Sequence, residues 1–253
     1  MGIKGTGAAA LAALRRLPAE KIVNGINMAT MAKQRNIYSG PMIDGTIVTR
    51  PVEESYKACG QAKVPVLVGA NSADLGFASG KTIQAIFAPF GSNAAQAEAA
   101  FDVKPGADVR KVAQEVGGVM DMIEPARFVA QSVSSCGQTA YEYRFSYVAA
   151  PLRSKLTGAP HSSEIPYVFD TIRESMWGNM GKGLTPEGIK IAWQANEYWV
   201  NFAKTGDPNG PGLPHWPKFT AAGDKLMNFT MKGPEGMVDP WAARLNAVEK
   251  IQK

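Results

Sequence analysis

Residues 64–76 read Val-Pro-Val-Leu-Val-Gly-Ala-Asn-Ser-Ala-Asp-Leu-Gly, a short apolar run that leads into a polar turn. The run Val64–Gly69 is rich in β-branched residues and ends at a glycine. This pattern favours a buried strand of a parallel sheet over a half-exposed strand. In α/β sheets the residues that carry chemistry gather at the carboxyl ends of the strands, and Asp74 follows such an end. An Asp in a turn after a strand is, however, more often a turn or capping residue.

Two further segments have strand character, and helical segments lie between them. Ala140–Val148 alternates aromatic and polar residues, and Lys225–Thr230 is a short third candidate. Helices are expected at Thr6–Arg16, Ile83–Phe87, Asn93–Phe101, Ala107–Val116 and Met120–Val133. Strands separated by helices predict an α/β sheet with helices on its faces.

The longest expected helix begins after Thr185, which is a typical N-cap and is followed by Pro186 at the first helical position. Apolar residues then recur at helical spacing, and the breaker sequence that starts at Gly206 ends the helix. Three strands make a thin sheet for 253 residues. The chain is therefore expected to be part of something larger.

Composition excludes several classes of function. Hydrophobic residues make up 45% of the chain and charged residues 19%, which is a globular composition. The net charge of +5 comes from scattered Lys and Arg, so no nucleic-acid-binding face is expected. No apolar run approaches the length of a membrane span. Gly76–Thr82 ends like a phosphate-binding loop, but only three residues separate its glycines where four are required, so no nucleotide cofactor is expected.

The two cysteines, Cys59 and Cys136, are too few and too far apart for a metal site. Two interpretations stay open. We favour two buried free thiols, because free Cys commonly behaves as a small buried hydrophobe. A single disulfide is the alternative if the protein is secreted.

His161 is one of only two histidines and lies in the loop segment Gly158–Phe169 (GAPHSSEIPYVF). From residue chemistry alone, a loop histidine is more often a hydrogen-bonded structural group than a catalyst. This loop follows the second strand, so His161 is expected at the same sheet edge as Asp74. The acid precedes the histidine, as in triads with the chain order Ser, Asp, His. Met176 and Trp177 follow the loop; such residues are usually core, although they are also candidates for a pocket lining.

Several stretches resemble, in the same order, the motifs of one enzyme family. They are Leu11–Glu20 (LAALRRLPAE), Pro41–Gly45 (PMIDG), Val64–Gly76, Pro125–Arg127, Ala140–Phe145, Gly158–Phe169, Trp199–Asn209 (WVNFAKTGDPN) and His215–Pro217. The chain thus resembles the C-terminal half of a type-B carboxylesterase, the cholinesterase-like branch of the α/β hydrolases. The resemblance covers nearly the whole chain, and the histidine and Trp-Pro motifs are specific.

The resemblance implies the C-terminal part of an α/β-hydrolase fold, a partial mixed sheet with flanking helices, with residues 1–253 forming one segment of a single domain. It implies hydrolysis of a small carboxylic ester without metal or cofactor. His161 would be the general base and acid, and Asp74 would orient it, where the family usually has Glu. Glu164 resembles a family carboxylate that we interpret as supporting, and His215 as structural.

The nucleophile of the family is missing from this sequence. No Gly-x-Ser-x-Gly elbow exists, and no His-Gly-Gly oxyanion turn. The resemblance implies that the serine elbow and the oxyanion turn belong to an N-terminal half of the enzyme. If that half is a separate chain, it would be a partner of this one. This chain alone is expected to be inactive. A non-catalytic interaction module or a pseudoenzyme fragment is the alternative, but the intact Asp74 and His161 motifs favour the enzyme. The family is often secreted or periplasmic, and Met1–Leu17 does not resemble a signal peptide.

Overall fold

The computed structural model describes residues 2–26 and 42–252, which divide into two compact units, Met1–Glu54 and Ser55–Lys253. The first unit contains α1 (Ala8–Arg15), α2 (Ala19–Val23) and the start of α3 (Val52–Lys57). The helix predicted near the N-terminus is confirmed by α1. In the PMIDG motif Pro41 lies outside the described residues, and Asp44 accepts hydrogen bonds from the backbone N–H groups of the three residues from Thr46 to Val48.

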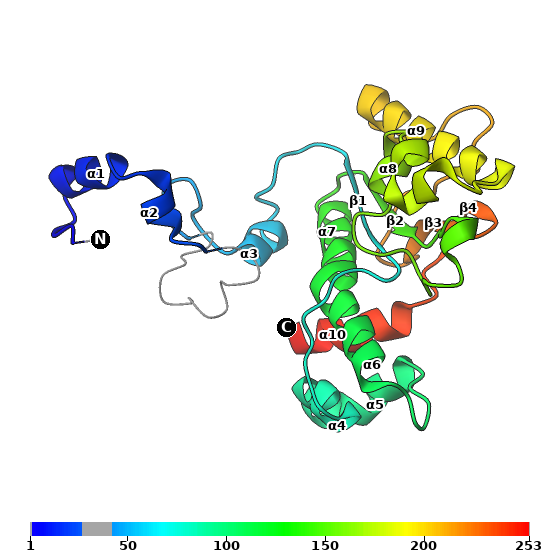
Figure 1. Ribbon diagram of the computed structural model, residues 1–253, viewed down its shortest axis with the longest axis horizontal. Helices are drawn as coiled ribbons and strands as arrows, with labels where there is room; N and C mark the ends of the chain where they lie inside the picture. The colour runs from blue at the N-terminus through cyan, green and yellow to red at the C-terminus, as the bar shows by residue number, and fades with distance from the viewer. Residues whose placement is uncertain (1, 27–41, 253) are drawn as a thin grey trace. The chain divides into compact units, whose positions relative to one another are not determined.

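A four-stranded mixed sheet forms the centre of the second unit (Figure 1). Its strands are β1 (Val66–Asn71), β2 (Ala140–Phe145), β3 (Lys225–Thr230) and β4 (Gly233–Val238), in that spatial order. β1 and β2 pair in parallel, as do β2 and β3, whereas β4 pairs antiparallel to β3. The three strands predicted from the sequence are confirmed. β4 was not predicted, because its sequence GPEGMV has low strand propensity and it depends on pairing with β3.

Helices cover both faces of the sheet (Figure 1). The α-helices of this unit are α4 (Ile83–Phe87), α5 (Ala94–Ala100), α6 (Val109–Gly118), α7 (Glu124–Ser135), α8 (Ile165–Val168), α9 (Pro186–Thr205) and α10 (Ala242–Gln252). Shorter turns are η2 (Ala88–Asn93), η3 (Val119–Ile123), η4 (Ala150–Leu152), η5 (Ile172–Glu174) and η6 (Met176–Gly181). α9 begins and ends as predicted, with the Thr185 side chain accepting a hydrogen bond from the Gly188 N–H and Gly206 left-handed at φ 76°.

One expectation about β1 is wrong. The sequence favoured a strand buried on both faces, but residues 66–69 are only half-buried. The reason is pairing: among the described residues β1 is hydrogen-bonded along one edge only, to β2. Its apolar sequence is that of an inner strand, although it lies at the edge of this sheet.

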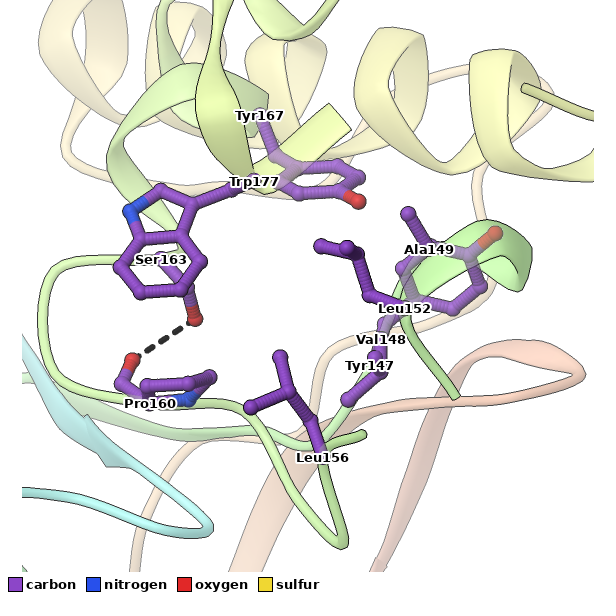
Figure 2. A pocket seen from close by; sticks show the side chains of 9 residues that line it. All are labelled: Tyr147, Val148, Ala149, Leu152, Leu156, Pro160, Ser163, Tyr167 and Trp177. Atoms are coloured by element: carbon purple, nitrogen blue, oxygen red, sulfur yellow. Dashed lines mark hydrogen bonds between the residues drawn. The ribbon is translucent and has the colours of Figure 1, made fainter. Parts of the chain in front are cut away.

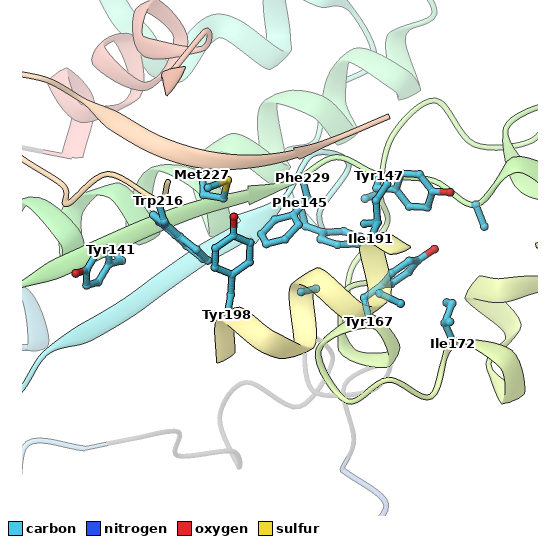
Figure 3. Packing of buried hydrophobic residues seen from close by; sticks show 14 residues of the cluster. Tyr141, Phe145, Tyr147, Tyr167, Ile172, Ile191, Tyr198, Trp216, Met227 and Phe229 are labelled. Atoms are coloured by element: carbon cyan, nitrogen blue, oxygen red, sulfur yellow. The ribbon is translucent and has the colours of Figure 1, made fainter. Parts of the chain in front are cut away.

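One face of the sheet packs an aromatic core around Trp216 (Figure 3). The Trp216 ring lies 5.2 Å from Tyr198 of α9 and 5.9 Å from Phe229 of β3, measured between ring centroids. Its indole N–H donates a 3.0 Å hydrogen bond to the backbone carbonyl of Glu142. This fully buried and hydrogen-bonded tryptophan of the Trp-Pro motif joins α9 to the centre of the sheet.

The opposite face carries buried charges, because the side chains of a strand alternate between faces. Arg144 of β2 donates a 2.9 Å hydrogen bond to Asp239, and both side chains are almost fully buried. Arg127 of α7 pairs with Asp224. Burial raises the pKa of Glu142 to about 8, partly offset by the charge of Arg144. The Oε2 atom of Glu142 has no hydrogen-bond partner among the residues that the structure describes.

We predict that Glu142 makes the protein less stable as pH rises. The folded-state pKa of about 8 lies above the ordinary 4.5, so between these values the folded protein keeps a proton that the unfolded chain releases. The free energy of unfolding should therefore decrease across this range, by up to about 1.4 kcal/mol per pH unit. Denaturant titrations from pH 5 to 8 should show a smaller decrease in Glu142→Gln. Glu235→Gln, at an exposed position of β4, is the control, and equal slopes in the wild type and Glu142→Gln would contradict the prediction.

Cys59 and Cys136 form a disulfide, with 5.6 Å between their Cα atoms. This corrects the free-thiol interpretation. The two cysteines are 77 residues apart, but Cys59 follows α3 just before β1, and Cys136 ends α7, the helix that leads into β2. Since β1 and β2 are neighbours, the segments that precede them also lie together. That proximity belongs to the tertiary structure and has no signature in the spacing of the cysteines.

Removing this disulfide should destabilise the second unit. The bond closes a loop with a sequence separation of 77 residues, and loop-closure entropy predicts a loss of about 4–5 kcal/mol. The double variant Cys59→Ser/Cys136→Ser should show that loss in urea titrations. Reducing the wild type with dithiothreitol should lower its stability by a similar amount, and an unchanged midpoint in both experiments would refute the prediction.

Candidate active site

Asp74 and His161 meet at the carboxyl edge of the parallel strands. The turn after β1 carries Asp74, and the long loop after β2 carries His161. The Nδ1 atom of His161 lies 2.6 Å from Oδ1 of Asp74. The structure therefore brings together the two residues that the sequence placed at the same edge.

The Asp74 carboxylate is buried and surrounded by donors. The Asn71 N–H donates to Oδ2 at 2.8 Å, and the Leu75 N–H donates to Oδ1 at 2.8 Å. Only 7% of the Asp74 side chain is exposed. Hydrogen bonds from two backbone N–H groups fix the direction of this carboxylate. Asp74 is thus held as an acceptor that faces His161.

The His161 ring is held at one nitrogen and open at the other. Its side chain is 54% exposed, and among the described residues no hydrogen bond reaches Nε2. A neutral imidazole that faces a carboxylate carries its proton on Nδ1, which leaves Nε2 as the acceptor. The geometry is therefore suited to taking a proton at Nε2 from a group on the solvent side.

The Asp74 turn and the His161 loop are joined by further hydrogen bonds. The Ala73 N–H donates to the Ala159 carbonyl at 2.9 Å, and the Ala159 N–H donates to Ser72 Oγ at 3.0 Å. Ala73 and Pro160 also form a parallel β-bridge. These contacts extend the pairing of β1 and β2 past the strand ends, so the acid and the histidine lie on one continuous surface.

Glu164 lies at the same junction but does not bond to the histidine ring. Its Oε2 accepts a 2.5 Å hydrogen bond from Nδ2 of Asn71. Among the described residues no hydrogen bond joins Glu164 to the His161 side chain. This position fits a supporting group, and it leaves Asp74 as the carboxylate that faces His161 Nδ1.

Three glycines let the Asp74 turn pack directly on a helix. A Cβ at Gly76 would lie 2.0 Å from the backbone of Gly117 and Gly118, which end α6. A Cβ at Gly118 would lie 2.9 Å from the carbonyl oxygen of Asp74. The next turn, η3, is a single π-helical turn, a feature frequent near functional sites. Sequence reasoning missed this contact; the pair Gly117-Gly118 inside a predicted helix was the available signal.

No serine of the turn or the loop contacts the His161 ring. Ser72 accepts from the Ala159 N–H, Ser162 donates to the His161 carbonyl, and Ser163 donates to the Pro160 carbonyl. The described residues also contain no group of three or more His, Cys, Asp or Glu side chains arranged for a metal ion. Within the described part of the chain the site is therefore a histidine and an acid without a nucleophile.

A small apolar pocket adjoins the histidine loop (Figure 2). Its lining consists of Tyr147, Val148, Ala149, Leu152, Leu156, Pro160, Ser163, Tyr167 and Trp177. The sequence left open whether Met176 and Trp177 are core or pocket-lining residues. Trp177 lines this pocket, whereas Met176 is 68% exposed and is not part of the lining. His161 is not part of the lining. The loop therefore has the pocket on one side and the Asp74 turn on another.

The arrangement matches a known class of fold. A mixed sheet with an acid and a histidine after successive parallel strands is an α/β-hydrolase arrangement. The solved structure of carboxylesterase EST55 from Geobacillus stearothermophilus matches with a TM-score of 0.69 and 22% identity, over 94% of this chain and 50% of that chain. The α/β-hydrolase fold expected from the sequence is thus confirmed.

The chain belongs to the carboxylesterase family, whose model matches residues 102–240. Fumonisin B1 esterase of Sphingopyxis macrogoltabida is 29% identical over 202 residues, which is 75% of this chain and 36% of that protein. Carboxylesterase 1C of Mus musculus is 24% identical over 212 residues, 74% of this chain and 37% of that protein. Acetylcholinesterase of Gallus gallus is 31% identical over 125 residues, 49% of this chain and 16% of that protein. The chain thus spans little more than a third of the first two relatives.

We expect Gly76→Ala to disturb the Asp74 turn. The added Cβ would meet backbone atoms at 2.0 Å, which no rotamer change can relieve. Overpacking of this kind lowers the free energy of unfolding by about 1–3 kcal/mol. Urea titrations should show this loss. Gly7→Ala, whose Cβ would meet no atom within 4 Å, should change little, and an equal effect of the two substitutions would argue against the close contact.

Proposed function

We propose that residues 1–253 are the C-terminal segment of one carboxylesterase domain that hydrolyses carboxylic esters. His161 and Asp74 are its catalytic histidine and acid in a Ser-His-Asp triad. The observation that carries this proposal is the 2.6 Å contact between His161 Nδ1 and Asp74 Oδ1 at the carboxyl edge of the sheet. Two of the similar proteins are named as esterases, the fumonisin B1 esterase and carboxylesterase 1C, which supports a carboxylic ester as the substrate.

In this mechanism His161 moves one proton in each direction. As a serine Oγ attacks the ester carbonyl carbon, Nε2 takes the hydroxyl proton and the carbonyl π electrons move to its oxygen. Nε2–H then gives the proton to the departing alkoxide when the tetrahedral intermediate collapses to an acyl-serine. A water molecule then attacks the acyl-serine in the same way: Nε2 takes its proton, returns a proton to the departing serine Oγ, and the carboxylic acid product is released. Throughout, Asp74 stabilises the imidazolium and keeps its proton on Nδ1.

Asp in place of the usual Glu is compatible with this role. Asp is one methylene shorter, so the backbone has to bring its carboxylate closer to the histidine. The turn at Asp74 supports this, because the N–H groups of Asn71 and Leu75 hold the carboxylate close to the backbone. The parallel bridge between Ala73 and Pro160 draws the histidine loop onto the same turn.

We infer that an N-terminal half supplies the serine and the oxyanion donors. The sequence has no Gly-x-Ser-x-Gly motif, and the chain spans 36% of the fumonisin B1 esterase. The edge of β1 that is free of hydrogen bonds among the described residues is a natural place for further strands, because an exposed strand edge pairs readily. The half-buried, apolar side chains of residues 66–69 support the same inference. The chain alone would then be inactive.

The proposal is tested with the complete protein. The coding sequence upstream of Met1 should contain an in-frame Gly-x-Ser-x-Gly motif, and the joined protein should hydrolyse p-nitrophenyl acetate. His161→Ala should lower kcat/KM by at least about 10³-fold, since the serine then has no base. His215→Ala removes the other histidine, which is exposed, and should leave the rate unchanged. Hydrolysis by the chain alone, or full activity of His161→Ala, would overturn the assignment and favour a non-catalytic module.

A further inference from the structure

We propose that Asn71 is a positioning residue for the acid–histidine pair. Its side-chain amide fixes Glu164 and the histidine loop so that His161 keeps Asp74 as its carboxylate partner. This inference rests on the proposed function for its catalytic meaning. The geometry that it concerns lies entirely within this chain.

Asn71 contacts both halves of the pair. It is the last residue of β1, and 1% of it is exposed. Its backbone N–H donates to Asp74 Oδ2 at 2.8 Å. Its side-chain Nδ2 donates to the Pro160 carbonyl at 2.6 Å and to Glu164 Oε2 at 2.5 Å. One residue thus bonds to the acid through its backbone and to the histidine loop through its side chain.

The chemistry of the neighbours fixes which way the amide points. Both close partners, a carbonyl oxygen and a carboxylate oxygen, only accept hydrogen bonds. The reversed amide would place Oδ1 of Asn71 against them. In the observed orientation Oδ1 is buried without a partner among the described residues, which is unfavourable. An aliphatic side chain at position 71 would have no buried Oδ1 and would avoid this cost. The presence of an amide is therefore explained by the two hydrogen bonds that its Nδ2 donates to Pro160 and Glu164.

Glu164 is the group that the amide has to control. It is three residues after His161, and it shares surroundings with Asp74. Burial raises the pKa of Tyr143, and the negative charges of Glu164 and Asp74 raise it further, so both carboxylates lie near one phenol. A second carboxylate this close competes with Asp74 for the Nδ1 proton of His161. The Asn71 bond engages Glu164 Oε2 and keeps that oxygen turned toward the strand end.

The test observes the Nδ1 proton of His161 by NMR in the ¹⁵N-histidine-labelled chain. The chain has only two histidines, and His215→Ala leaves one. Asn71→Leu keeps the side-chain volume and the backbone N–H to Asp74 but removes the amide. We expect the downfield Nδ1–H signal to exchange with water at least about tenfold faster, or to vanish. The ¹⁵N shifts should move from the Nδ1–H tautomer toward a mixture of tautomers.

Four further variants distinguish a positioning role of Asn71 from a general loosening of the loop. Glu164→Gln and Glu164→Ala both remove the competing carboxylate, so each should retain the Nδ1–H signal. Ser162→Ala removes a hydrogen bond of the same loop that does not involve Asn71, the one to the His161 carbonyl, and should leave the signal unchanged. The Asn71→Leu/Glu164→Ala double variant should regain most of the signal, because the carboxylate that Asn71 restrains is then absent, although the Asn71 bond to the Pro160 carbonyl is still missing.

An unchanged Nδ1–H signal in Asn71→Leu would refute the inference. If Asn71→Leu does not fold, as judged by circular dichroism, Asn71→Ala removes the same amide, and an unchanged signal there refutes the inference equally. The signal is measured without any serine or substrate. Loss of the signal in Asn71→Leu therefore supports the positioning role of Asn71 even if the complete protein proves inactive. An active His161→Ala enzyme would refute only the proposed function.

Discussion

The parallel pairing of β1 with β2 is the constraint on which the rest of the site depends. Its register pairs Val66 with Ala140 and Asn71 with Phe145, so both strands end at the same level. The turn that carries Asp74 and the loop that carries His161 therefore emerge side by side. Gly69 makes the pairing possible, because a Cβ there would lie 2.3 Å from the carbonyl oxygen of Tyr143. The 2.6 Å contact between acid and histidine is a consequence of this register.

The two faces of the sheet stabilise that pairing by different means. On one face the aromatic side chains around Trp216 exclude water and lock α9 against β2 and β3. On the other face Arg144 and Asp239 place an ion pair in the interior, and Glu142 adds a buried carboxyl group. Buried charges contribute little net stability, but they tolerate few alternative arrangements. A slip of one residue in β2 would exchange the two sets of side chains between faces, so their difference protects the register.

The sequence was sufficient for the features that local composition determines. Two strands were identified by the apolar run before Asn71 and by the alternating residues of 140–148. The long helix was bounded by the N-cap Thr185 and by the helix-breaking sequence that starts at Gly206. The motif around His161 identified the candidate base. β4 was missed although its partner β3 directly precedes it in the chain. The Gly76 contact was missed, and the disulfide was kept only as the alternative, because each depends on a partner distant in sequence. β4 has no strand propensity of its own, and the cysteines meet only once β1 and β2 have paired.

The carboxylate Glu164 shows why proximity along the chain alone does not identify the partner of His161. Glu164 is three residues from His161 and Asp74 is 87 positions earlier, yet the order of the motifs favoured Asp74. In the structure Asn71 bonds to Glu164 Oε2 while two backbone N–H groups hold Asp74 toward the ring. A carboxylate that is already ordered loses little further freedom when the imidazole becomes charged. The acid–histidine pair is thus preorganised within this chain, and under the proposed function an N-terminal half would have to supply the serine hydroxyl at Nε2 and the oxyanion donors.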